Sequence, residues 1–176
     1  MVLRKINAGL SLLSTILLMY HAIFHAAWML SQGSIEKRAN IMSWVLFGLM
    51  MLHAFVSIDL VASTYMETES CKCKHYPKMN VSTLVQRVSG VLLIVFTVLH
   101  VAGTIGYLQP PPLVHAILPP VFFTVALLHT AVSTSKAFVT LGIGNAKFVR
   151  VADVAIKGIC VVTLLADVVG FYLYLA

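Results

Sequence analysis

Five long apolar segments decide what this chain can fold into. They cover about residues 6–30, 41–64, 83–108, 113–136 and 151–175. Each reaches the ~20 residues that an α-helix needs to cross ~30 Å of hydrocarbon. We therefore expect an all-α membrane protein with five transmembrane helices, forming a single domain over residues 1–176.

The composition agrees with lipid as the solvent. Of the 176 residues, 60% are apolar and only 10% are charged, which is more hydrocarbon than a small soluble core can bury. The connections between the segments are short and leave no room for a soluble catalytic domain. Any soluble chemistry is therefore expected from a partner protein. The net charge of +6 reflects basic loops, and we expect no nucleic-acid partner.

Basic residues predict the orientation, because loops that stay in the cytoplasm are enriched in Lys and Arg. One side would carry only Lys37 and Arg38. The other side would carry Arg4, Lys5, Lys72, Lys74, Lys78, Arg87, Lys136, Lys147 and Arg150. We expect a cytoplasmic N-terminus and a location in the bacterial cytoplasmic membrane.

Proline, glycine and cysteine refine this plan. Pro119 and Pro120 either kink the fourth helix or mark its start, whereas Gly142 and Gly144 should end it. The cysteines are expected to be free thiols. The run from Cys71 to His75 lacks a second ligand pair at zinc spacing and is not a covalent haem motif, so a haem would be held non-covalently.

Histidines inside the apolar segments are the most informative residues, because an ionisable side chain is costly there and usually marks function. A single buried histidine is equally well explained by structural hydrogen bonding. At least one on each of the first four segments favours iron ligation, with haem held between facing helices. These residues are His21, His25, His53, His100 and His129.

Depth predicts an outer pair. From Arg87, His100 lies 13 residues on, or ~20 Å; from Lys5, His21 lies ~24 Å along and His25 ~30 Å. His21 therefore matches His100 better than His25 does.

An inner pair follows in the same way. His129 precedes Lys136 by seven residues, or ~10 Å, and His53 lies ~16 Å from the inner end of its helix. Two b-type haems stacked in this way would form an electron path. Ser89, Lys136 and Arg87 would suit haem propionates or a quinone, although both basic residues equally suit the role of a positive-inside anchor.

The third segment resembles a known family. Gln86, Arg87, Val88, Ser89, Gly90 and Val91, followed by His100, are similar to the R-x-S-G helix of the cytochrome b anchor subunits of succinate:quinone oxidoreductases. The arginine-to-histidine spacing is similar to that of the dihaem, single-polypeptide type. Leu52, His53, Ala54 and His129 resemble that group's other haem-bearing helices.

The resemblance implies a function and partners. A flavoprotein subunit would interconvert succinate and fumarate, an iron–sulfur subunit would relay electrons, and this chain would exchange them with a quinone, menaquinone being favoured. The iron ligands would be His21, His53, His100 and His129. The resemblance is also compatible with a dimer formed by two copies of the whole complex. We expect the iron–sulfur partner to face the cytoplasmic lysines, namely Lys72, Lys74, Lys78, Lys136 and Lys147.

A quinone near the outer haem needs a proton carrier. Glu36, His115 and Asp167 are candidates, and His25 would border the same site. Simpler explanations favour a solvated loop charge for Glu36, an interfacial side chain for His115, and a helix cap or interhelical hydrogen bond for Asp167. Asp153 and Lys157, four residues apart, most simply pair with each other.

Two alternatives stay open. The first is the cytochrome b subunit of a hydrogenase or formate dehydrogenase, against which the Arg87, Ser89 and Gly90 pattern argues. The second is a haem-free transporter whose histidines carry protons or metal. A visible spectrum separates these classes, because bis-histidine haem gives sharp bands on reduction.

Overall fold

The described residues form five helices that together make up almost the whole chain. The computed structural model describes residues 2–31, 40–70, 80–107 and 112–175. Its helices are α1 (Val2–Leu30), α2 (Asn40–Ser70), α3 (Val81–Thr104), α4 (Pro112–Leu141) and α5 (Ala146–Leu175). Each contains a stretch long and apolar enough to cross a membrane. The expectation of an all-helical protein with five candidate membrane spans is confirmed.

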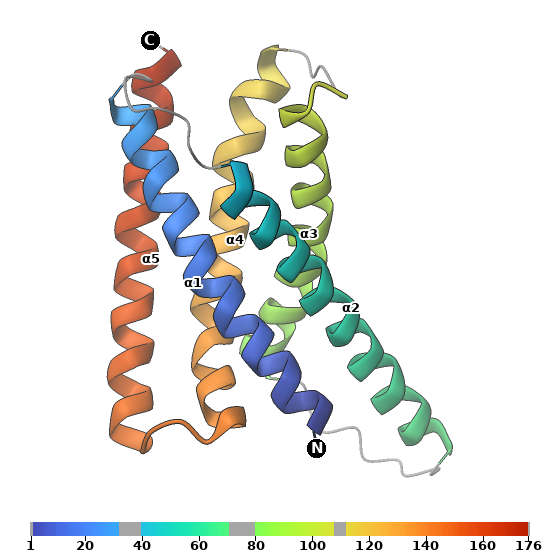
Figure 1. Cartoon of the computed structure of the whole chain (residues 1–176). Helices are drawn as coiled ribbons and strands as arrows, with labels where there is room; N and C mark the ends of the chain where they lie inside the picture. The colour runs from blue at the N-terminus through green and yellow to red at the C-terminus, as the bar shows by residue number, and fades with distance from the viewer. Residues whose placement is uncertain (1, 32–39, 71–79, 108–111, 176) are drawn as a thin grey trace.

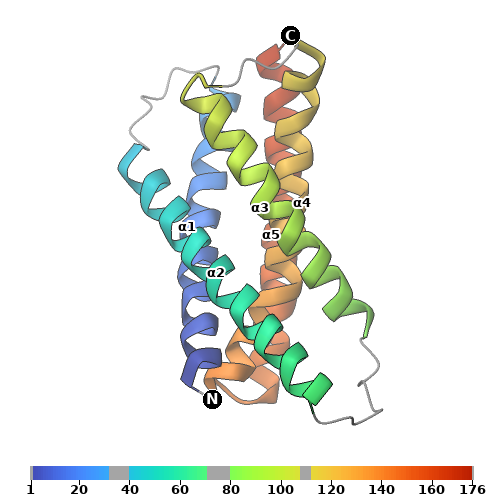
Figure 2. The same ribbon diagram turned by 90° about the vertical axis from the view of Figure 1, so that its right-hand side faces the viewer.

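The helices are arranged so that four of them enclose an interior. α1 packs against α2, α4 and α5, while α4 packs against α1, α3 and α5 (Figures 1 and 2). α2 contacts α3 at only a few positions, and in the described ranges the diagonal partners, α1 with α3 and α2 with α4, do not pack on each other. The helices α1 to α4 therefore form a four-sided bundle, and α5 covers the seam between α1 and α4.

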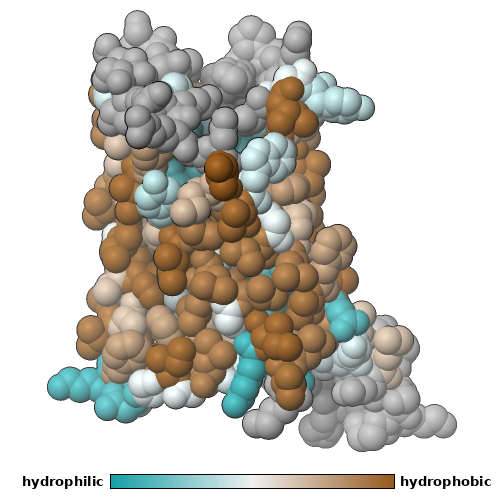
Figure 3. Space-filling model, in the orientation of Figure 1, coloured by the Kyte–Doolittle hydropathy of each residue, from teal (hydrophilic) through white to brown (hydrophobic). Residues whose placement is uncertain are grey.

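The outer surface is apolar over most of its height. Figure 3 shows a hydrophobic belt across the helices, with hydrophilic residues gathered near the end where the chain begins. Large apolar side chains are exposed on this belt, among them Ile16, Phe55, Val91 and Val162. A water-soluble protein does not expose such a continuous patch, so the belt is the surface that would meet lipid.

Small residues allow the helices inside the molecule to approach closely. Ala22 and Ala126 are fully buried where α1 and α4 meet. On α5, a Cβ added at Gly170 would lie 3.2 Å from the Cβ of Met29 on α1. Close packing of this kind holds helices together in lipid, where burial of hydrocarbon gives little driving force.

The ends of α3 and α4 differ from the expected ones. α3 ends at Thr104 rather than near 108, because Gly106 adopts a φ of 77° and the Tyr107 N–H donates to the Ala102 carbonyl at 2.9 Å. α4 begins at Pro112 and contains Pro119 and Pro120 inside it, so a start at those prolines is wrong.

The turn between α4 and α5 is shorter than predicted. α4 continues to Leu141, past residue 136 where the fourth segment was expected to end. Gly142 and Gly144 then end it, with φ of 73° and 75° that favour glycine. Asn145 restarts the helix at once, because its Oδ1 accepts a hydrogen bond from Phe148 N at 2.9 Å.

Candidate functional site

Each helix of the four-sided bundle contributes one histidine to the interior. His21 lies on α1, His53 on α2, His100 on α3 and His129 on α4. His21 is close enough to His100 for the two rings to interact electrostatically, and His129 is similarly close to His53. These electrostatic interactions cross the bundle, from α1 to α3 and from α2 to α4, and the pairing of the histidines at two haems stays a prediction.

His21 is oriented by a residue that the sequence did not single out. Its Nδ1 lies 3.2 Å from the hydroxyl of Ser43 on α2. A histidine that ligates a metal usually has its second ring nitrogen fixed by such a polar partner. With Nδ1 held in this way, Nε2 is the nitrogen suited to bind iron.

His25, one turn further along α1, has a different partner. Its Nδ1 is hydrogen-bonded to Oδ1 of Asp167 on α5, at 3.4 Å. Asp167 is only 3% exposed, and its second oxygen, Oδ2, is buried without a hydrogen-bond partner in the described part of the chain. The ring of His25 also lies beside Phe123, with 4.8 Å between ring centroids. The sequence left Asp167 either as a proton carrier or as a residue with a capping or interhelical hydrogen bond. The structure shows the interhelical hydrogen bond.

An aromatic ring packs against one member of the outer pair. The ring of His100 stacks on Phe122 of α4, with centroids 5.0 Å apart and 19° between the planes. Phe122 belongs to the buried core cluster together with Leu93 and Ala126. These residues fill the region between the outer histidines and the level of His129.

The inner pair contains a second serine contact. The Ser89 hydroxyl on α3 lies 3.0 Å from Nδ1 of His129 on α4, and Ser89 is 3% exposed. A Cβ added at the next residue, Gly90, would lie 3.1 Å from Cε1 of the same ring. Ser89, predicted to meet a propionate, therefore holds the His129 ring in this structure, and Gly90 provides the space in which the ring lies.

A cavity of about 180 Å³ opens beside His53. The Nδ1 atom of His53 is buried without a hydrogen-bond partner among the described residues. Arg4 and Lys136 both line the cavity, and no Asp or Glu is among its described lining residues. Lys136 Nζ donates to Gln86 Oε1 at 2.8 Å. The cavity therefore carries positive charge close to an imidazole whose Nδ1 has no hydrogen-bond partner among the described residues.

The chemistry of these residues suits a haem. Paired imidazoles are suitable axial ligands, and serine hydroxyls hold the Nδ1 atoms of His21 and His129. The space beside His53 is smaller than the ~300–1,000 Å³ of typical cofactor sites. A haem beside His53 would therefore need more space than this cavity provides.

Other sequence candidates lie elsewhere. Arg87 is exposed on α3 and does not line the cavity. Glu36 and the run from Cys71 to His75 lie outside the described residues, as does the side chain of His115, whose backbone is in α4. Asp153, Lys157 and Cys160 lie within the described residues.

Asp153 and Lys157 pair as expected, and Cys160 is a buried free thiol. Within the part of the chain that the structure describes, no three His, Cys, Asp or Glu side chains gather as a metal-ion site.

The fold defines a class, that of helical proteins with several candidate membrane spans. No protein-family model matches the chain, and neither the curated proteins nor the solved structures give a significant match.

Proposed function

We propose that this chain is a dihaem cytochrome b, the membrane anchor of a succinate dehydrogenase or fumarate reductase. The observation that supports the proposal is that α1, α2, α3 and α4 each carry a partly buried histidine, and that hydroxyls of neighbouring helices contact two of them, Ser43 at His21 and Ser89 at His129. One imidazole from each of four helices, paired across both diagonals, is the arrangement that two bis-histidine haems require. The pattern of Arg87, Ser89 and Gly90 on α3 supports this particular family.

The chain's own residues would have different roles at the haems. The four histidines would supply imidazole ligands to iron, while Ser43 and Ser89 fix the rings of His21 and His129. When bound, the haems supply one-electron transfer between the iron–sulfur subunit and a quinone. Arg4 and Lys136, which line the cavity beside His53, provide charge for propionate carboxylates.

The quinone would be reduced or oxidised near the outer pair, and by the resemblance it is menaquinone. His25 and Asp167 lie beside His21 and form a buried hydrogen-bonded pair that can hold a proton. Glu36 and His115 remain candidates for the same role. The pair on α1 and α5 is favoured because its two side chains meet in the structure.

The orientation we propose has the N-terminus in the cytoplasm of a bacterium. The start of α1 and the turn between α4 and α5 lie at the same end of the molecule (Figure 1). Arg4, Lys5, Lys147 and Arg150 belong to this end, as the positive-inside rule favours. The iron–sulfur subunit would dock there, in contact with the cytoplasmic lysines, of which Lys72, Lys74 and Lys78 lie outside the described residues.

The test is to purify the complex from its membrane and record the difference between its reduced and oxidised spectra. We expect sharp b-type bands and about two haems per anchor by pyridine haemochrome. Soluble flavoprotein and iron–sulfur subunits that oxidise succinate should co-purify. Hydrogenase or formate dehydrogenase subunits would assign the anchor to another complex, and the absence of haem bands would favour the transporter.

A further inference from the structure

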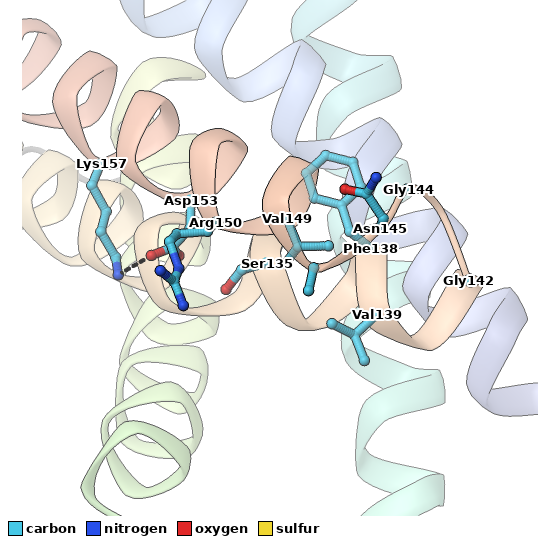
Figure 4. Close-up of a pocket in the computed structure, with 11 residues that line it drawn as sticks. Ser135, Phe138, Val139, Gly142, Gly144, Asn145, Val149, Arg150, Asp153 and Lys157 are labelled. Carbon is cyan, nitrogen blue, oxygen red and sulfur yellow. Dashed lines mark hydrogen bonds and ion pairs between the residues drawn. The ribbon is translucent and has the colours of Figure 1, made fainter.

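The hairpin of α4 and α5 has a large open groove on its outer side. It measures about 550 Å³ and lies between the last turns of α4 and the first turns of α5 (Figure 4). Ser135 and Phe138 line it from α4, and Arg150 and Lys157 line it from α5. None of these residues belongs to the histidine sites, so the proposed function leaves the groove unexplained.

The groove has an unbalanced positive charge. Lys157 Nζ is paired with Asp153 Oδ2, one turn away on the same helix. Arg150 also lines the groove and has no hydrogen-bond or ion-pair partner among the described residues. Two cations thus face one carboxylate. An anion with several oxygen acceptors, such as a phosphate, would satisfy the guanidinium.

The walls of the groove suit hydrocarbon. Phe138, Val139 and Val149 line it, and Val139 is 67% exposed. Lys157 lies 11 residues after Ala146, where α5 begins, or ~16 Å along the helix axis. The groove therefore extends from the end of the helices into the apolar belt, so its occupant must be charged at one end and apolar at the other.

We propose that this groove binds an anionic phospholipid, with the phosphate at Arg150 and an acyl chain along Val139. The site goes beyond the proposed function and does not depend on it. A free phosphate would satisfy the guanidinium but would leave the apolar wall uncovered. A basic pocket between membrane helices, on the side where basic residues gather, is a recognised setting for anionic lipid headgroups.

Native mass spectrometry of the purified full chain in neutral detergent tests the proposal. The chain is mixed with phosphatidylglycerol or with phosphatidylcholine of the same acyl chains. We expect preferential retention of phosphatidylglycerol, and a loss of affinity of about tenfold in Arg150→Gln, because a charge-assisted hydrogen bond is removed. Lys147→Gln is the matched control: Lys147 is exposed in the first turn of the same helix but does not line the groove.

A second variant tests the apolar wall without altering charge. Val139→Trp should fill the groove and also weaken phosphatidylglycerol binding, while size-exclusion profile and helix content stay unchanged. Equal binding of both lipids, or an equal loss in Arg150→Gln and Lys147→Gln, would overturn the proposal. So would displacement of phosphatidylglycerol by inorganic phosphate, which would make the groove a free-anion site. Protection of Arg150 from phenylglyoxal only when soluble subunits are bound would instead assign it to a protein interface.

Discussion

His25 on α1 and Asp167 on α5 are joined by a hydrogen bond of 3.4 Å between Nδ1 and Oδ1. This contact ties His25 to the helix that lies outside the four-sided bundle. His21, one turn earlier, is bonded instead to Ser43 on α2 and lies near His100 on α3. Two histidines that the sequence pattern could not distinguish by face therefore have different surroundings.

Replacement of each of these histidines separates their roles. His21→Ala should lower the haem content from about two to about one per chain, because it removes an axial ligand of the outer haem. His25→Ala should retain both haems and slow quinone turnover. The measurement is pyridine haemochrome on the purified complex. Loss of a haem from His25→Ala alone would show that the ligand is His25.

The two serines should each affect a different haem. Ser43→Ala removes the partner of His21, and Ser89→Ala removes the partner of His129. Each change is expected to weaken binding of its own haem by ~10–100-fold, as is usual for residues that orient a metal ligand. Haem titration followed by electron paramagnetic resonance would tell which of the two signals is lost. If both variants lose the same signal, the assignment of the pairs is wrong.

Gly90 is expected to tolerate no side chain without displacing His129. Gly90→Ala would place a Cβ 3.1 Å from Cε1 of the ring, so the inner haem signal should shift or disappear. Gly103→Ala on the same helix is the matched control, because a Cβ there meets nothing within 4 Å. The control should leave both spectra unchanged and stabilise α3 by up to ~1 kcal/mol. An unaltered spectrum in Gly90→Ala would contradict this prediction.

Loss of the contact between α1 and α5 should reduce stability. Asp167→Ala leaves His25 Nδ1 without its partner, so the free energy of unfolding should fall by ~1–3 kcal/mol. Asp153→Ala breaks a partly exposed pair with Lys157 and should cost no more than ~1 kcal/mol. Unfolding in mixed micelles measures both changes. Equal losses would mean that the His25–Asp167 hydrogen bond stabilises the protein no more than the exposed Asp153–Lys157 pair does.

Hydropathy predicted the helices well but several of their ends poorly, for a physical reason. Apolar composition reports the thickness of the lipid that a helix crosses, and a helix can continue beyond it. α4 extends past Lys136 to Leu141, and α5 starts at Ala146 rather than at 151. In both places the helix continues through residues, 137–141 and 146–150, that were not assigned to a membrane span. Only Gly142 and Gly144, with their positive φ, define where the helix stops.

The depth of each histidine along its helix could be predicted, because depth depends only on residue number and rise. The residues that contact those histidines could not be predicted from the sequence. Ser43 and Gln86 contact His21 and Lys136 only because of the rotation and tilt of α2 and α3, and neither is encoded in the spacing of one helix. Ser89 was singled out, but its contact with the His129 ring depends on how closely α3 approaches α4.

The position of α1 between α2, α4 and α5 has a consequence for biosynthesis. The chain leaves the ribosome from its N-terminus, so α1 meets α2 first and must wait for its other two neighbours. Until then the face with Ala22 and Ala26 stays open to lipid, or to the insertion machinery. Truncation before α5 would leave the part of that face around Ala26, which packs on Gly170, permanently uncovered.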